Sequence, residues 1–252
     1  MKTHLSLHQR IRNADASQQI ENVKAVHAYT HARNWPSEEW NNVWDLSDDC
    51  SWAHGFGRWR GGYKVYLNSV TEWDVQAFDT YKKLYKKFPD IMGMDPRPLN
   101  VSPMHILCNE VIEVADDGRS GRAAYMTPGH IFTYLRTAGT RWATLMWERY
   151  GSDFVCDKDG HWKYLHEHVC PDIGCGYDGK SNWGLTAYQM AMDPKAFMPP
   201  DMGDYEPRDY QVDDPGPLHR DYGFLVPVQN TCPWPEPYQT MDEAHSYTPP
   251  RA

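Results

Sequence analysis

The histidines and tyrosines of this chain are the residues best suited to chemistry, and several share one predicted strand. Residues 161–170 read HWKYLHEHVC, and simple alternation puts four side chains on one face: Trp162, Tyr164, His166 and His168. Two aromatic rings and two imidazoles rarely form a plain solvent surface. This face is therefore predicted to be either a core with polar tips or the lining of a cavity, where Tyr164 and His166 would contact a substrate.

His105 is the leading acid–base candidate, because it opens a predicted strand and imidazole titrates near neutral pH. The alternative is a strand histidine that only satisfies a hydrogen bond. Tyr125 and Tyr164 fall on facing strands, and a buried tyrosine needs a polar partner that a ligand hydroxyl can supply. We predict Tyr125 as a catalytic partner, with an ordinary core tyrosine as the alternative.

Three further positions depend on which way a side chain points. Tyr29 and His31 lie on the first predicted helix, where Tyr29 is either core or catalytic and His31 contacts substrate. Glu148 alternates with its neighbours, so it can act as a base only if it faces inward. Trp147 is the neighbour that we predict to contact the substrate.

A glycine-rich stretch, AHGFGRWRGG (residues 53–62), supplies another group of candidates. It lies within residues 50–66, which are predicted to form a strand, a glycine-rich turn and a continuation of the strand. Its glycines allow either a sharp turn or a close approach of the backbone to a ligand. We predict His54 as an acid–base partner, Arg60 as a stabiliser of a phenolate or oxyanion, and Tyr63 as a substrate contact. A surface arginine is the alternative for Arg60. The stretch lacks the lysine and serine of a phosphate-binding loop.

No metal or cofactor is predicted. His166 and His168 lie two residues apart and point the same way, which would suit a metal, but no acidic residue is obviously placed as a third ligand. The chain has six cysteines without a C-x-x-C pair, which argues against structural zinc and favours reduced thiols.

Composition narrows the class of protein. The 252 residues carry a net charge of -9, which disfavours nucleic acid as a partner. The N-terminus lacks the apolar region of a signal peptide, and no apolar run reaches the length of a membrane span, so a cytoplasmic protein is expected. Eleven tryptophans and sixteen tyrosines predict a large core, a site for a flat apolar ligand, or a subunit interface.

The order of elements predicts an α+β protein. Residues 1–16 are expected to form a flexible arm, Ser17 to cap a first helix, and residues 69–88 to form the clearest amphipathic helix. Four strands joined by short turns follow between residues 104 and 172, the first of them over residues 104–114. Helices ahead of an antiparallel meander are typical of the α+β class. Pro128-Gly129 marks a predicted bend, and Asp157 to Gly160 a tight turn.

Residues 173–252 differ in composition, with twelve of the nineteen prolines. This extension is predicted to lack regular secondary structure. Because it is also rich in tyrosine and tryptophan, much of it is expected to be ordered and wrapped over its own domain or a neighbouring subunit.

Several segments resemble the nuclear-transport-factor-like, or SnoaL-like, superfamily. They are HILCNEVIEVADDGRSGRA, the YMTPGH patch that follows it, and WERYGSDFVCDKDGHWKYLHEHVCPD. The resemblance covers residues 17–172. It implies a cone-shaped α+β barrel in which N-terminal helices pack on a strongly curved antiparallel sheet and enclose one pocket.

The scytalone-dehydratase-like branch of this superfamily implies catalysis without metal or cofactor. Its helix tyrosine corresponds to Tyr29 and its first strand histidine to His105, while its second histidine falls within residues 125–130. Two of its positions are not matched: the acidic residue falls at Thr30 or His31, and a strand tyrosine falls near His54. These departures place the same dehydration chemistry in doubt.

The chain is also similar to sphingomonad γ-formaldehyde lyases, which act on lignin-derived aromatic dimers. The predicted function is a cofactor-independent lyase that takes a small phenolic aromatic alcohol, loses water through a quinone methide and releases formaldehyde. The alternatives are a dehydratase or isomerase of a polyketide- or steroid-like substrate, and a non-catalytic ligand-binding or assembly domain. A homodimer or homotrimer is expected, because a curved sheet leaves an apolar convex face.

Overall fold

The computed structural model has the α+β architecture that the order of elements predicts. It describes residues 5–32, 36–54, 57–69, 86, 101–134, 142–177, 232–242 and 244–247. The elements within these residues are α1 (Leu7–Ala32), α2 (Pro36–Val43), β1 (Ser51–His54), β2 (Gly57–Arg60), α3 (Gly62–Ser69), β3 (Val101–Met104), β4 (Cys108–Val114), β5 (Ser120–Tyr134), β6 (Trp142–Cys156) and β7 (Trp162–Tyr177).

The strands of the described residues form one sheet in the order β2-β1-β7-β6-β5-β3, and β4 also pairs with β5. Strands β4 to β7 pair antiparallel with their sequence neighbours, which confirms the predicted meander. Strand β1 then joins the far side of β7 in parallel. A register shift between Pro128 and His130 on β5 confirms the predicted bend.

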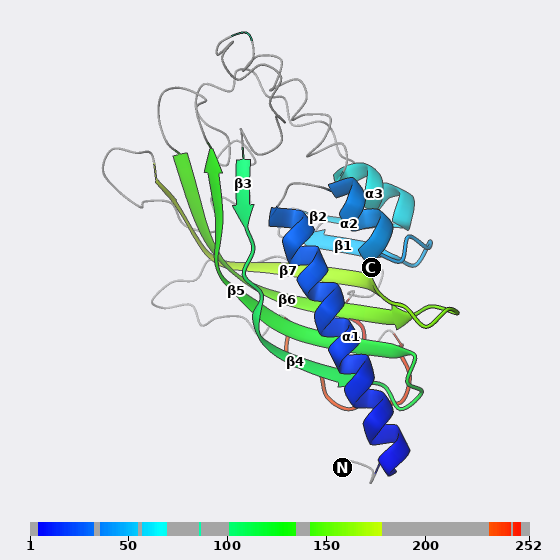
Figure 1. The fold of residues 1–252 in the computed structure, drawn as a ribbon. Coiled ribbons are helices and arrows are strands. Elements are labelled where there is room, and N and C mark those ends of the chain that lie inside the picture. The colour runs from blue at the N-terminus through cyan, green and yellow to red at the C-terminus, as the bar shows by residue number, and fades with distance from the viewer. Residues whose placement is uncertain are drawn as a thin grey trace.

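The sheet is strongly curved, and α1 lies across its concave face (Figure 1). The C-terminal segment, residues 232–247, passes behind the sheet on the convex side (Figure 1). Large apolar side chains fill the space between α1, α2 and the sheet, among them Ile20, Trp44 and Phe154. Side chains on the concave face of β6 and β7 therefore face the helices, whereas side chains on the convex face lie towards the C-terminal segment.

Helix α1 begins at Leu7, so residues 7–16 are helical and not a flexible arm. Its start is a capping box rather than the predicted cap at Ser17. The backbone N–H of Gln9 donates to Ser6 Oγ at 3.2 Å, and the N–H of Ser6 donates to Gln9 Oε1 at 2.9 Å. These reciprocal bonds satisfy two backbone donors that the helix leaves unpaired.

Three other boundaries differ from the predictions. The strand predicted over residues 104–114 is split into β3 and β4, with Asn109 in the left-handed region at φ 55°. Helix α3 begins at Gly62, where a strand was expected to continue. Strand β7 runs on to Tyr177, five residues into the predicted extension. Of the helix predicted over residues 69–88, the structure describes only residues 69 and 86. This prediction therefore lies outside the described residues.

The turn between β6 and β7 is as predicted. Asp157 Oδ1 accepts hydrogen bonds from the N–H groups of Asp159 (2.9 Å) and His161 (2.8 Å), and Gly160 adopts φ 89°. Glycine reaches this left-handed conformation without a steric cost. The turn therefore fixes how β6 and β7 begin to pair.

No helix in the described part of the chain has both the length and the apolar character needed to cross a membrane.

Candidate active site

The inward face of α1 carries polar groups. Ile20, Lys24 and His27 are spaced by four and three residues, and all are buried against the sheet. Tyr29, by contrast, is 71% exposed on the outer face of α1. The structure therefore places His27, and not Tyr29, beside the sheet. Sequence reasoning missed it because the inward stripe interrupts its apolar run with lysine and histidine.

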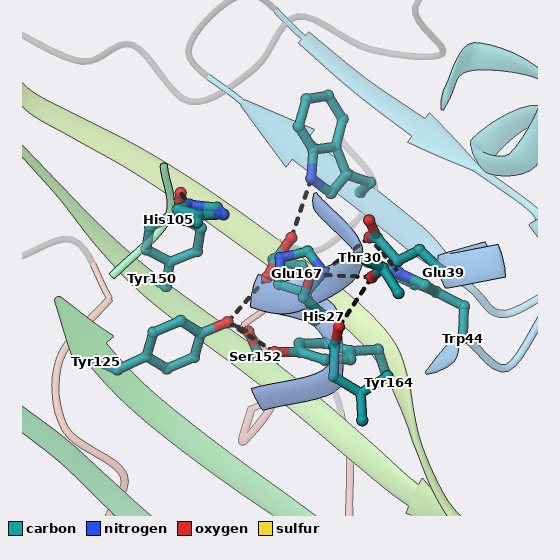
Figure 2. Close-up of polar contacts among 12 residues, drawn as sticks. His27, Thr30, Glu39, Trp44, His105, Tyr125, Tyr150, Ser152, Tyr164 and Glu167 are labelled. Carbon is teal, nitrogen blue, oxygen red and sulfur yellow. Dashed lines mark hydrogen bonds and ion pairs between the residues drawn. The ribbon is translucent and has the colours of Figure 1, made fainter. Parts of the chain in front are cut away.

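His27 forms a buried pair with Glu39 of α2. His27 Nδ1 donates to Glu39 Oε1 at 2.7 Å, and Trp44 Nε1 donates to the same oxygen at 3.4 Å (Figure 2). Burial alone would lower the pKa of His27. The negative charges of Glu39 and Glu167, with the hydrogen bond to Glu39, overcome burial and raise the pKa to about 9. His27 is therefore an imidazolium at neutral pH.

His105 belongs to a second assembly, which starts in the break between β3 and β4. Tyr150 Oη donates to Glu148 Oε2 at 2.6 Å, and His105 Nε2 lies 2.7 Å from the same hydroxyl. Because the hydroxyl proton goes to the carboxylate, His105 must donate its Nε2–H to Tyr150. A neutral His105 then carries its basic lone pair on Nδ1. Burial, followed by the charges of Glu148 and Glu167, raises the pKa of Tyr150 well above its ordinary value.

Tyr125 and Glu167 form the third assembly. Tyr125 Oη donates to Glu167 Oε1 at 2.8 Å, and Trp52 Nε1 donates to Glu167 Oε2 at 3.2 Å. Ser152 Oγ (2.9 Å) and Tyr164 Oη (3.2 Å) also lie within hydrogen-bond distance of the Tyr125 hydroxyl (Figure 2). Burial, and next the charge of Glu167, raises the pKa of Tyr125 well above its ordinary value, so this phenol stays protonated.

A bulge in β7 decides which of its side chains face inward. Phe154 pairs with Tyr164, but the next residue back, Asp153, pairs with His166, so β7 gains one residue there. Tyr164 and Glu167 consequently share the concave face. The prediction that Tyr164 and His166 share a face is wrong: His166 Nδ1 donates to Asp153 Oδ2 at 2.8 Å on the convex face.

The three assemblies form one cluster beneath α1 (Figure 2). The ring centroids of His27 and His105 are 5.6 Å apart, and those of His27 and Tyr164 are 5.3 Å apart. The rings of Tyr125 and Tyr150 stack with centroids 5.0 Å apart. Lys24 Nζ lies 4.2 Å from the centroid of the Tyr125 ring. Cationic, basic and phenolic groups thus converge within one buried region.

The charges in this cluster are mixed. Buried carboxylates come from Glu39, Glu148 and Glu167, and buried cationic side chains from Lys24 and His27. Burial lowers the pKa of Lys24, although nearby acidic groups oppose the shift. Ionised groups away from water are costly unless they are paired. Their concentration here is typical of a site where protons are moved rather than of a core built for stability.

The other predicted site residues lie elsewhere or outside the description. Tyr63, on α3, is 75% exposed. Trp147 is 46% exposed, because Glu148 takes the inward position on β6. Arg60 ends β2, which β1 separates from β7. The side chains of His31 and His54 lie outside the described residues, so their roles stay predictions. Of the predicted residues, the structure brings together His105, Tyr125, Tyr164 and Glu148, which faces inward.

No protein-family model and no curated protein matches the sequence. Among solved structures, the chain is similar to a nuclear transport factor 2-like superfamily protein from Salmonella enterica serovar Typhimurium, at 15% identity and a TM-score of 0.44. The match covers 68% of this chain and 96% of that protein.

Two other similar structures belong to proteins named for an activity. One is a putative scytalone dehydratase from Novosphingobium aromaticivorans (14% identity, TM-score 0.41, 69% of this chain and 96% of that one). The other is a hexachlorocyclohexane dehydrochlorinase, LinA type 2 (14% identity, TM-score 0.43, 71% of this chain and 100% of that one). Likenesses this distant do not assign a reaction to this chain.

Proposed function

We propose that this protein is a lyase that eliminates water from a neutral aromatic alcohol by acid–base catalysis with its own side chains. The observation that carries this proposal is the placement of a carboxylate-backed base beside a protonated acid. His105 is oriented by Tyr150 and Glu148, and the imidazolium of His27 lies with its ring centroid 5.6 Å from that of His105. Elimination needs one group of each kind.

The base in this scheme is His105 Nδ1. The hydrogen bond from Nε2–H to Tyr150 fixes the tautomer, and the carboxylate of Glu148 stabilises the positive charge that His105 gains on accepting a proton. His105 would take a proton from the carbon next to the alcohol, or from a phenol conjugated with it. The electrons released form the new double bond and expel the hydroxyl group.

The acid is His27. Its proton passes to the departing hydroxyl, which leaves as water, and the ring becomes neutral beside Glu39. The Tyr125 hydroxyl, held by Glu167, is a further donor for an oxygen on the substrate. After product release, exchange with water returns a proton to His27 and removes one from His105. Each positioned acid or base contributes roughly 10²- to 10⁴-fold to the rate.

Two properties of the cluster point to the substrate class. Its three buried carboxylates outnumber its two buried cationic side chains, and this excess of negative charge disfavours an anionic substrate. The rings of Tyr125 and Tyr150 stack on each other, as do those of Trp44 and Tyr164, so the surroundings of the cluster are largely aromatic. Aromatic surroundings favour a substrate with a flat ring. A neutral, hydroxylated aromatic compound satisfies both requirements.

A narrower version of this proposal is loss of formaldehyde from a para-hydroxyaryl diol. Loss of the phenol proton to His105 and of water gives a quinone methide; removal of the proton from the terminal hydroxyl then breaks a carbon–carbon bond and sends its electrons to the ring oxygen. The protonated His105 returns its proton to that oxygen. The products are formaldehyde and a stilbene-type phenol. This second step needs another proton acceptor, and the separate Tyr125–Glu167 assembly is what favours it.

The test is incubation of the full chain with neutral aromatic alcohols, including lignin-type diols, followed by assays for conjugated product and for formaldehyde. We expect new conjugated absorbance that His105→Gln lowers by at least about 100-fold. Formaldehyde in equal amount supports the narrower version. Compounds that raise the melting temperature without any turnover would instead support the binding-domain alternative and overturn the lyase.

A further inference from the structure

The convex face of the sheet carries a second group of reactive side chains, distinct from the buried cluster. His168 and Cys170 lie two residues apart on β7 and point outward, opposite to Glu167. Cys232, from the C-terminal segment, lies over them. Their ligand atoms, one imidazole nitrogen and two sulfurs, all lie within 4.8 Å of one another. Two segments that are 62 residues apart in sequence thus bring together three side chains of types that can bind a metal.

The position of Cys232 is fixed by its surroundings. Its Sγ lies 2.9 Å from Cys170 Sγ and 3.5 Å from the carbonyl oxygen of His168. The next carbonyl, that of Pro233, accepts a 2.5 Å hydrogen bond from Tyr247 Oη. Cys232 also adopts φ 52°, a left-handed conformation that few non-glycine residues take. The neighbouring contacts therefore hold the thiol against β7.

We propose that His168, Cys170 and Cys232 bind a zinc ion that fastens the C-terminal segment to β7. Two thiolates and an imidazole are soft and borderline ligands that select Zn²⁺ over Ca²⁺ or Mg²⁺. Zinc–ligand bonds of about 2.0 to 2.3 Å place such ligand atoms about 3.3 to 3.8 Å apart around a tetrahedron. The two sulfurs, at 2.9 Å, are closer than this, so zinc binding would require the cysteine side chains to move apart by less than about 1 Å.

The histidine distinguishes zinc from the simplest alternative, which is a disulfide between the two cysteines. A disulfide uses the sulfurs alone, whereas zinc also uses the imidazole of His168, which is buried beside them (7% exposed). Cys170 is fully buried, but Cys232 is partly exposed and gives the ion a route into the site. Tetrahedral zinc keeps a fourth position, for water or another protein group.

A zinc ion here would stabilise the fold rather than take part in elimination. It would close the chain between β7 and residues 232–247, which already contact the convex face through Ser246, Tyr247 and Asp153. Binding to the native state alone stabilises a protein by mass action, so removing the ion is expected to lower the melting temperature. It would also expose the C-terminal segment to proteases.

The experiment measures zinc and cobalt binding by the full chain, purified with a thiol reductant. We expect one equivalent of Zn²⁺, and a thiolate-to-metal charge-transfer absorption on replacement by Co²⁺. Cys170→Ser, Cys232→Ser and His168→Asn should each weaken binding by more than the ~10- to 100-fold typical of losing a group that only supports a ligand. Cys156→Ser, on β6 and outside the group, is the matched control.

Three results would overturn the proposal. One is substoichiometric zinc in the reduced wild-type protein. Another is zinc binding that all three substitutions leave unchanged. The third is an intact mass lower by two hydrogens after purification with reductant, with Cys170 and Cys232 recovered as one cross-linked peptide. The cobalt absorption of the wild type decides the ligand type even if a variant fails to fold.

Discussion

His27 and Glu39 face each other across 2.7 Å between α1 and α2, and both side chains are at most 4% exposed. The pair links the packing of the helices to the proposed chemistry. A charged imidazole there attracts α2 to α1, and the same charge supplies the proton for the leaving group. The electrostatics that hold this part of the fold together therefore also prepare the acid.

This pair predicts a loss of stability at alkaline pH. The pKa of His27 rises from 6.5 to about 9 on folding, so its contribution is fully present below pH 6.5 and is lost as the pH rises through 9. The total is on the order of 3 kcal/mol. The free energy of unfolding, measured with urea at pH values from about 6 to about 9.5, should show this decline in the wild type and not in His27→Gln.

His161→Gln is the matched control, because His161 is exposed in the β6–β7 turn. It should follow the wild type at every pH. A His27→Gln variant that declines with pH in parallel with the wild type would show that His27 is not charged in the folded protein.

Tyr150 is predicted to act by positioning His105. Tyr150→Phe removes the hydroxyl that accepts from His105 Nε2 and donates to Glu148, so the imidazole loses its fixed tautomer. We expect kcat to fall by about 10²-fold with a smaller change in KM. The pH profile of kcat should also shift, which a purely structural role would not produce.

The control for this variant is Tyr29→Phe, which removes the same atom from an exposed position. The loss of the buried hydroxyl also costs roughly 1 to 3 kcal/mol of stability, because Glu148 loses a donor. Rates should therefore be measured well below the melting temperature. Equal kcat values for the two variants would rule out the positioning role.

Tyr125 and Glu167 should be energetically coupled. A double-mutant cycle of Tyr125→Phe and Glu167→Gln isolates the 2.8 Å hydrogen bond between them. We expect a coupling free energy of unfolding of about 1 to 3 kcal/mol, since the acceptor is a buried carboxylate. Additive effects would mean that Glu167 is held by Trp52 and its other surroundings without help from Tyr125.

The meander and its turns were predictable because local chemistry specifies them. Asp157 and Gly160 encode the β6–β7 turn, and Pro128 with Gly129 encodes the bend in β5. The capping box at Ser6 and Gln9 was equally visible in the sequence, but the polar composition around it concealed the helix start. Turns and caps depend on neighbours in sequence, which is why they can be read directly.

The active cluster was only partly predictable, because a single bulge reverses the faces of a strand. Strict alternation places Tyr164 with His166, but the extra residue in β7 places Tyr164 with Glu167. The partners of Glu167 come from elsewhere in the chain, with Trp52 115 residues away. The parallel pairing of β1 with β7, which brings Trp52 there, has no local signal in the sequence.

The convex face also differs from the apolar surface on which the expected dimer or trimer was based. It carries Arg122, Asp153 and His166, and the chain's own residues 232–247 cover part of it. For these described residues, the extension packs on its own domain. The expectation of a homo-oligomer stays a prediction, and a size measurement in solution would test it.

Asp153 is predicted to hold the C-terminal segment without affecting the chemistry. Its Oδ2 accepts hydrogen bonds from Ser246 Oγ (2.6 Å) and Tyr247 N–H (3.0 Å), as well as from His166. Asp153→Asn removes the charge and can turn an NH₂ group towards these donors, which costs roughly 1 to 3 kcal/mol. Hydrogen exchange in residues 232–247 should therefore accelerate by at least about tenfold.

The same variant should keep kcat within about twofold of the wild type, because Asp153 lies on the opposite face of β6 from Tyr150 and Ser152. Asp242→Asn is the matched control: Asp242 belongs to the same segment, is exposed, and pairs only locally with His245 among the described residues. Unchanged exchange in Asp153→Asn would mean that other contacts hold the segment. A large loss of kcat with the segment still protected would mean that the two faces of the sheet are coupled.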